Sequence, residues 1–130
     1  MERPRTPAKS PETAHQDAEV CVEVDPGICG FHCTVRVFRS KAKVVEIEIS
    51  GSECRQIQRL SEKLESISLK DLFKPMTKNP VFLAAENSRC HTTCIVPSAV
   101  LKAAEAALEM ALPSAVRIRF LKRGEKVEDE

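Results

Sequence analysis

The stretch FHCTVRVFRSKAKVVEIEIS, residues 31–50, decides the fold. Apolar side chains alternate with polar ones in two runs, which are Phe31, Cys33, Val35 and Val37, then Val45, Ile47 and Ile49. Alternation with a period of two is typical of a strand that buries one face. The short link Ser40-Lys41-Ala42 lies between the runs. We therefore expect these residues to form a β-hairpin.

A helical pattern follows the hairpin. Its apolar residues recur at three- and four-residue spacing, at Cys54, Ile57, Leu60 and Leu64. Ser52 is suited to the N-cap position, and the pattern ends near Ser66. The sequence thus predicts a first helix with Cys54 in its opening turn.

Two further helices are expected. Residues 69–73 are expected to form a helical turn that Pro75 breaks, and Asn79-Pro80 is typical of the cap and first residue of a short helix. Pro97 then opens SAVLKAAEAALEMAL, the pattern richest in Ala and Leu, and Pro113 ends it. This last helix is the strongest prediction of the three.

Strand patterns flank this central region on both sides. Val20, Val22 and Val24 alternate before the hairpin, and apolar and basic residues alternate through 115–120 after the last helix. Strands, then helices, then one strand predict an α+β domain. We expect a mostly antiparallel sheet of three N-terminal strands and one C-terminal strand, packed by two to three helices.

Composition predicts the domain organisation and the compartment. Residues 1–17 are Pro-rich and residues 122–130 are mostly charged, so both are expected to be tails around a single domain at 18–121. The N-terminus carries charges and prolines where a signal peptide has an apolar run, and no stretch approaches a membrane span. These features indicate a cytoplasmic protein that does not act at a membrane.

Charge argues against a nucleic-acid partner. The chain has 20 basic and 19 acidic residues, and its only aromatic residues are five Phe. It therefore lacks both a basic field and a stacking platform. In a reducing cytoplasm, its six cysteines are expected to be ligands, catalytic groups or core residues rather than disulfides.

Cysteines at the ends of elements are the candidate functional residues. Cys29 lies in the turn sequence Asp25-Pro26-Gly27-Ile28-Cys29-Gly30, and Cys54 opens a helix, where the helix dipole favours a thiolate. Cys90, His91 and Cys94 precede another helix and offer sulfur and nitrogen ligands suited to zinc or iron. Their Cys-x3-Cys spacing differs from the usual zinc and redox motifs.

The remaining cysteines have simpler explanations. Cys33 shares a strand face with Val35 and Val37, so we expect it in the core, although it could lean toward Cys29. Cys21 points away from the valines of its strand and is expected to be incidental.

These motifs resemble a family of short, uncharacterised proteins of anaerobic prokaryotes. The resemblance rests on VDPGICGF, the helix-opening Cys54, and CHTTCIVPSAVLKA followed by ALPSAVRIRF. The family has no assigned activity, so the resemblance implies no function.

The order of the motifs also resembles, more distantly, the U-type iron–sulfur cluster scaffolds (IscU and the NifU N-terminal domain). Cys29-Gly30 precedes the hairpin, Cys54 opens a helix, and His91 with Cys94 precedes an Ala-rich helix. The resemblance implies a pocket of three thiolates and a histidine. Phe31 stands where the scaffolds have an aspartate, and His91 does not adjoin Cys94, so donation of a cluster to other proteins is less firmly implied.

The leading hypothesis is a small protein that binds a metal ion or an iron–sulfur cluster. Cys29, Cys54 and Cys94 would be thiolate ligands, with His91 or Cys90 completing the shell and iron–sulfur or zinc as the cofactor. Such a protein could exchange its metal with a protein partner. Two alternatives remain open, a thiol enzyme or sulfur carrier with Cys54 or Cys94 as nucleophile, and an interaction module whose cysteines only pack.

Overall fold

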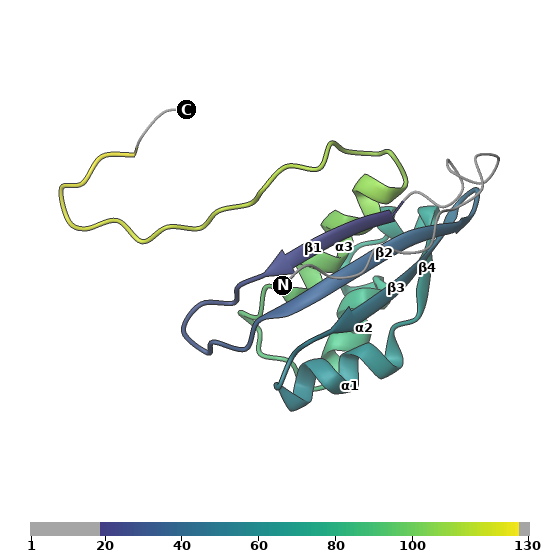
Figure 1. Ribbon diagram of the computed structural model, residues 1–130, viewed down its shortest axis with the longest axis horizontal. Coiled ribbons are helices and arrows are strands. Elements are labelled where there is room, and N and C mark those ends of the chain that lie inside the picture. The colour runs from purple at the N-terminus through teal and green to yellow at the C-terminus, as the bar shows by residue number, and fades with distance from the viewer. Residues whose placement is uncertain (1–18, 128–130) are drawn as a thin grey trace, which may run out of the picture.

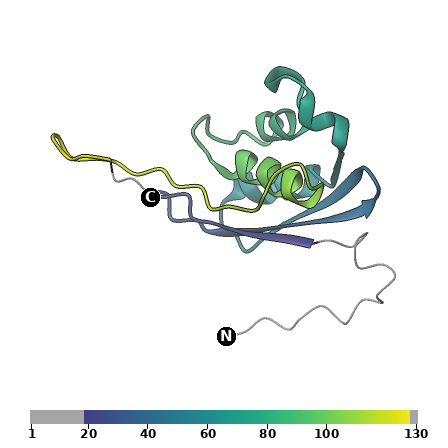
Figure 2. The same ribbon diagram turned by 90° about the horizontal axis from the view of Figure 1, so that it is seen from above.

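The computed structural model describes residues 19–127 as a four-stranded antiparallel sheet with helices packed on one face (Figure 1; Figure 2). The strands lie in the order in which they occur in the chain: β1 (Glu19–Val24), β2 (Cys33–Lys41), β3 (Val44–Ser50) and β4 (Ser66–Ser68). The helices are α1 (Arg55–Lys63), α2 (Pro80–Asn87) and α3 (Val96–Ala107), with 3-10 helices η2 (Leu69–Phe73) and η3 (Met76–Lys78) before α2. The predicted α+β class is confirmed, whereas the predicted tail at 1–17 lies outside the described residues.

The predicted hairpin is the centre of the sheet. Antiparallel pairing of β2 with β3 sets Val35 opposite Ile49 and Val37 opposite Ile47. All four side chains are buried, because alternation directs them to the face that the helices cover. On the other face, the Arg36 guanidinium forms ion pairs with Glu19 of β1 and Glu48 of β3.

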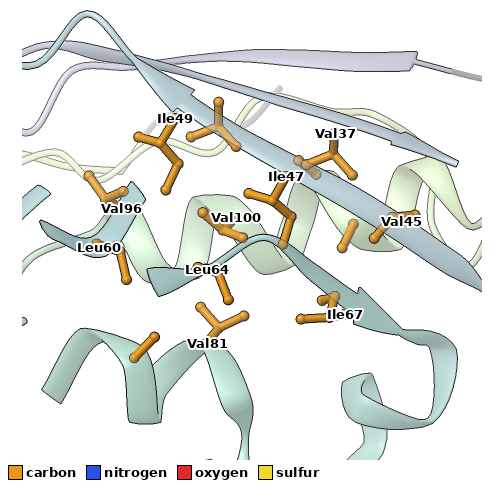
Figure 3. Close-up of a cluster of buried hydrophobic side chains, with 14 of the residues drawn as sticks. Val37, Val45, Ile47, Ile49, Leu60, Leu64, Ile67, Val81, Val96 and Val100 are labelled. Atoms are coloured by element: carbon orange, nitrogen blue, oxygen red, sulfur yellow. The ribbon is translucent and has the colours of Figure 1, made fainter. Parts of the chain in front are cut away.

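The core fills the space between the sheet and the helices (Figure 3). It is built from aliphatic side chains of every layer: Val37, Val45, Ile47, Ile49, Leu60, Leu64, Ile67, Val81, Val96 and Val100. α3 packs across β1 and β2, while α1 packs on β3 and α2 lies against both other helices. Figure 2 shows that this leaves the second face of the sheet without a helix.

Two helix boundaries differ from the predictions. α1 begins after Cys54, which is its N-cap instead of a first-turn residue, and ends at Lys63, just before β4. α3 ends at Ala107, well before Pro113, because Glu109 adopts a left-handed conformation with φ of 63°. The amide of Met110 then donates to the carbonyl of Glu105 at 2.8 Å and closes the helix end.

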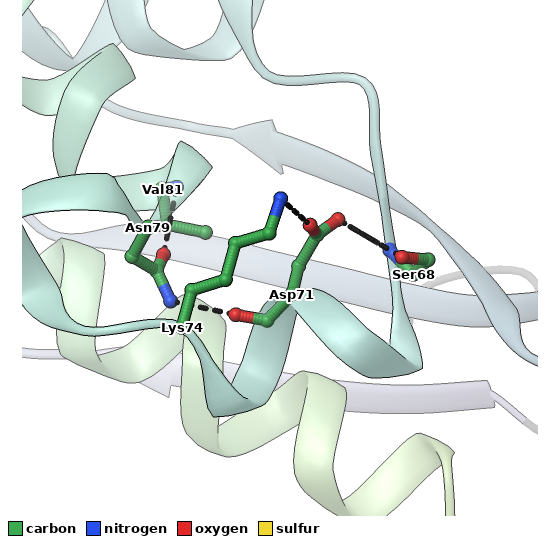
Figure 4. Close-up of polar contacts among 5 residues, drawn as sticks. All are labelled: Ser68, Asp71, Lys74, Asn79 and Val81. Atoms are coloured by element: carbon green, nitrogen blue, oxygen red, sulfur yellow. Dashed lines mark hydrogen bonds and ion pairs between the residues drawn. The ribbon is translucent and has the colours of Figure 1, made fainter.

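A polar corner, formed by Ser68, Asp71, Lys74 and Asn79, supports the start of α2 (Figure 4). Asn79 is the predicted N-cap, and its side-chain oxygen accepts a hydrogen bond from the amide of Val81 at 2.9 Å. Its side-chain nitrogen donates to the Asp71 carbonyl at 3.0 Å. The Asp71 carboxylate in turn accepts from the amide of Ser68 and pairs with Lys74 at 2.8 Å.

The predicted C-terminal strand is wrong as a strand of this sheet. The fourth strand is the short β4, which pairs with β3 through Val45 and Ile67. Residues 115–120 keep an alternating sequence but lie extended and exposed, outside the sheet (Figure 1). Because α3 ends early, the chain leaves the domain before it reaches this pattern, and residues 109–127 are exposed throughout.

Candidate cysteine site

Three connections meet at one end of the sheet. The β1–β2 loop, the β3–α1 connection and the α2–α3 connection all lie at the end to which β1 points (Figure 1). Because neighbouring strands are antiparallel, β1 and β3 end at the same end of the sheet, so the β1–β2 loop and the β3–α1 connection lie there together. α3 packs back along β1 and β2, so it also begins at this end. These connections carry the cysteines that the sequence singled out.

Glycines shape the β1–β2 loop. Asp25 accepts a hydrogen bond from the Gly27 amide at 3.1 Å, and the Gly30 amide donates to the Gly27 carbonyl at 2.9 Å. Gly27 and Gly30 have φ of 94° and 73°, a region that residues with a Cβ adopt at a cost. Between them, the loop presents Cys29 to solvent.

Cys33 begins β2 and is buried on the helix-covered face, opposite Val24 of β1. Burial raises the pKa of its thiol to about 11, and negative charge on Cys94 and Cys54 adds to the rise. The predicted core position is thus confirmed, but Cys33 also lies within electrostatic reach of two candidate ligands.

Cys54 joins the sheet to α1. Its amide donates to the Ser52 hydroxyl at 3.0 Å, and its thiol donates to the side-chain oxygen of Gln56 at 3.1 Å. The side chain is half-buried against the core. Ser52, the predicted N-cap, therefore holds Cys54 at the cap position.

Cys90 follows the end of α2. Its amide donates to the Ala85 carbonyl at 3.0 Å after Arg89 turns the chain with φ of 63°. Burial raises the pKa of the Cys90 thiol to about 11; negative charge on Cys94 and Cys54 raises it further, and the Arg59 guanidinium opposes the rise.

Cys94 stands just before α3, in a turn closed by its amide donating to the His91 carbonyl at 3.1 Å. Burial raises the pKa of the Cys94 thiol, and so does negative charge on Cys54 and Cys29. A hydrogen bond from the Val96 amide acts in the opposite direction. The amide at the start of α3 therefore offsets part of the rise at Cys94 but does not reverse it.

We call the five side chains that interact in this way the thiol cluster: Cys29, Cys33, Cys54, Cys90 and Cys94. Cys94 is central, because it interacts electrostatically with each of the other four. Cys54 interacts with three of them, and Cys29 reaches the cluster through Cys94. All six cysteines of the chain are free thiols.

The other predicted residues lie at the margin of the cluster or outside it. His91 is exposed on the turn between Cys90 and Cys94. Cys21 is exposed on the opposite face of the sheet, where it pairs across the strands with Arg36. Cys21 is therefore outside the cluster, as expected.

No three His, Cys, Asp or Glu side chains of residues 19–127 are close enough together to hold a metal ion as they stand. The chemistry of the donor set still suits a soft or borderline cation, since five thiols gather at one end of the domain. Binding would need the thiols to lose protons and draw together, and Cys29 is the member of the cluster that lies exposed on a loop.

Sequence reasoning missed two members of this site. Cys33 was expected in the core with at most a lean toward Cys29, and it was left out of the candidate ligands although its four-residue spacing from Cys29 across a glycine turn is a signal that the two could meet. Arg59 was missed because it lies on the less buried side of α1, and only the packing of α1 beside the α2–α3 connection brings it to Cys90.

Comparison with known proteins identifies the family. The family model DUF6951, described as a family of unknown function, matches residues 20–120. The chain belongs to this family. Neither the curated proteins nor the solved structures contain a significant match.

The DUF6951 match spans the sheet, the three helices and the whole thiol cluster. It also includes residues 115–120, which lie outside the folded layers. In the part of this DUF6951 chain that the structure describes, no helix is long and apolar enough to cross a membrane.

Proposed function

We propose that this protein binds a metal ion or an iron–sulfur cluster through Cys29, Cys54 and Cys94. Cys90 or His91 would complete the shell. The observation that supports this proposal is the central position of Cys94, whose thiol interacts electrostatically with Cys29, Cys33, Cys54 and Cys90 at one end of the domain. Thiolates at the ends of elements are the ligands that zinc and iron–sulfur clusters prefer.

The raised pKa values favour a metal ligand over a nucleophile. A free thiol must be ionised to attack, and burial and neighbouring thiolates raise the pKa of Cys94, one of the two candidate nucleophiles. Burial also raises the pKa values of the neighbouring Cys33 and Cys90 thiols to about 11. A bound cation reverses this balance, because its charge stabilises several thiolates together and displaces their protons. Metal affinity should therefore rise steeply with pH.

Exchange of the metal with a protein partner is part of the proposal. Ile28 is fully exposed beside Cys29 in the β1–β2 loop. An apolar side chain next to a thiol is suited to contact with a partner that delivers or removes the metal.

The test is anaerobic purification of the full chain followed by metal and sulfide analysis and visible absorption. We expect bound iron with sulfide, or bound zinc, in the wild type. Cys29→Ala, Cys54→Ala and Cys94→Ala should each lower the metal content several-fold. Cys21→Ala is the matched control, because Cys21 is a free cysteine on the opposite face.

Two results would count against the proposal. One is a wild-type protein that takes up neither zinc nor an iron–sulfur cluster after reconstitution under reducing conditions. The other is equal metal loss from Cys21→Ala and Cys94→Ala, which would indicate adventitious binding by any thiol. Rapid alkylation of a single cysteine at neutral pH in a metal-free protein would instead favour the thiol-enzyme alternative.

A further inference from the structure

Residues 115–120 form a strand-like segment that the domain does not use. Val116, Ile118 and Phe120 are 62%, 73% and 94% exposed, and they alternate with Arg117 and Arg119. In an extended chain this alternation places the three apolar side chains on one face and the two guanidinium groups on the other. Apolar side chains exposed in such a row mark an interaction surface. We call residues 115–120 the C-terminal segment.

The sheet offers a matching edge. Within the described residues, β1 pairs with β2 on one side and with no strand on the other. Val20 and Val22 of β1 are only half-buried, although they share the helix-covered face with the buried Val24. An added strand would cover these side chains and satisfy the backbone groups along the edge.

Charge matches the segment to this edge. Glu19 and Glu23 point to the face of β1 opposite its valines, and the strand has no basic residue. The C-terminal segment has two arginines and no acidic residue, so addition to β1 would exchange the present ion pair of Arg119 with Glu125 for one with a β1 glutamate, while Glu19 keeps its pair with Arg36. When apolar side chains of both strands face the helices, the arginines lie on the same face as the glutamates. Cross-strand pairs of opposite charge stabilise such pairing.

We propose that the C-terminal segment adds to β1 of a second copy of this chain, and that the two copies exchange segments in a symmetric dimer. Both views show the segment running past the end of the sheet and away from its own domain (Figure 1; Figure 2). Reciprocal exchange covers both exposed β1 edges and both apolar rows with one two-fold interface. This inference does not depend on the proposed metal site.

The mass of the full chain in solution tests the dimer. Light scattering during gel filtration should give twice the chain mass of 14.4 kDa. Ile118→Lys should shift the protein to the monomer, since it places a charge in the apolar row. Val127→Lys is the matched control, because both residues are 73% exposed and Val127 lies outside the segment. Circular dichroism should show both variants folded.

Hydrogen exchange distinguishes this dimer from the other arrangements. Amides of residues 115–120 and of β1 should exchange about tenfold more slowly in the wild type than in Ile118→Lys. Replacing Arg117 and Arg119 with Glu should weaken the dimer about tenfold. A monomer whose segment is protected would mean addition to its own β1, and a monomer whose segment is unprotected would mean no strand addition. A dimer that survives Ile118→Lys would use another surface. Each of these three results overturns the proposal.

Discussion

The polar corner and the thiol cluster both join helices to the sheet, but they satisfy their side chains differently. In the polar corner, Asp71 and Asn79 exchange hydrogen bonds with backbone and side-chain partners at 2.9 to 3.1 Å. In the thiol cluster, backbone hydrogen bonds hold the connections, while burial and then neighbouring thiols raise the pKa values of Cys33, Cys90 and Cys94.

This difference separates a structural motif from a candidate binding site. A buried polar network whose members are satisfied stabilises the fold and needs no ligand. Thiols that lie at one end of a domain oppose one another's ionisation, and a bound cation stabilises them as thiolates. The first region should therefore determine stability in every condition, and the second should depend on metal and pH.

The largest effect on stability should come from the polar corner. Asn79→Ala removes the cap acceptor for the Val81 amide and the donor to the Asp71 carbonyl, both in a side chain that is 3% exposed. We expect a loss of about 2 kcal/mol in the free energy of unfolding, measured by urea denaturation. Asn87→Ala, at the exposed end of α2, is the control and should change it by less than about 0.5 kcal/mol.

A loss at Asn79 no greater than that at Asn87 would show that the corner is not a stabilising network. The contrast with the thiol cluster would then fail, because the polar corner would not stabilise the fold either.

The next effect is alkaline destabilisation through the thiol cluster. The folded-state pKa of Cys33 is raised from 9.0 to about 11, so its contribution to stability is complete below about pH 9 and is lost as the pH rises toward 11. The metal-free, reduced protein should lose on the order of 1–2 kcal/mol over this interval. Urea denaturation at several pH values measures the loss.

Cys33→Val keeps an apolar side chain at this buried strand position and removes the titrating group. The variant should show a shallower decline between pH 9 and 11 than the wild type. An identical decline in both proteins would mean that other groups cause it and that burial of Cys33 does not hold its proton.

Sequence periodicity predicted most of the fold because local patterns determine it. Alternation placed Val35, Val37 and Ile47 correctly, and the Asn79-Pro80 signal located the start of α2. It failed at residues 115–120, where the alternation is present but the segment pairs with no strand of the described sheet. Local pattern predicts a strand, whereas pairing depends on where the preceding helix ends.

The candidate site was predictable only in part, for a similar reason. Cysteines at element ends identified Cys29, Cys54 and Cys94, but burial and convergence are properties of packing between connections distant in sequence. The inclusion of Cys33 and the contribution of Arg59 follow from how α1 and α3 pack on the sheet.

Acid should weaken the polar corner and leave the thiol cluster unaffected. Partial burial opposes ionisation of Asp71, but hydrogen bonds from Lys74 and Ser68 outweigh it and lower the pKa of the carboxyl below 3.8. Its contribution is therefore present above about pH 4 and is lost as the pH falls through the lowered pKa. Asp71→Asn should remove up to about 1 kcal/mol at pH 7 and flatten the acid limb of the stability curve. A variant with an unchanged acid limb would show that Asp71 does not link this corner to pH.

The smallest effect should come from Arg59, which both donates a structural hydrogen bond and acts on a thiol of the cluster. Its guanidinium donates to the Ser88 carbonyl at 3.2 Å and opposes the rise in the Cys90 pKa. Arg59→Met keeps an unbranched side chain on α1 and should cost about 0.5–1 kcal/mol at pH 7 through the lost hydrogen bond. It should also raise the pKa of Cys90 further and leave that of Cys33 unchanged, which ¹³Cβ chemical shifts of the cysteines can follow against pH. If the two thiols shift together, the cluster responds as one electrostatic unit; if only Cys90 shifts, Arg59 acts on one member, as the geometry predicts.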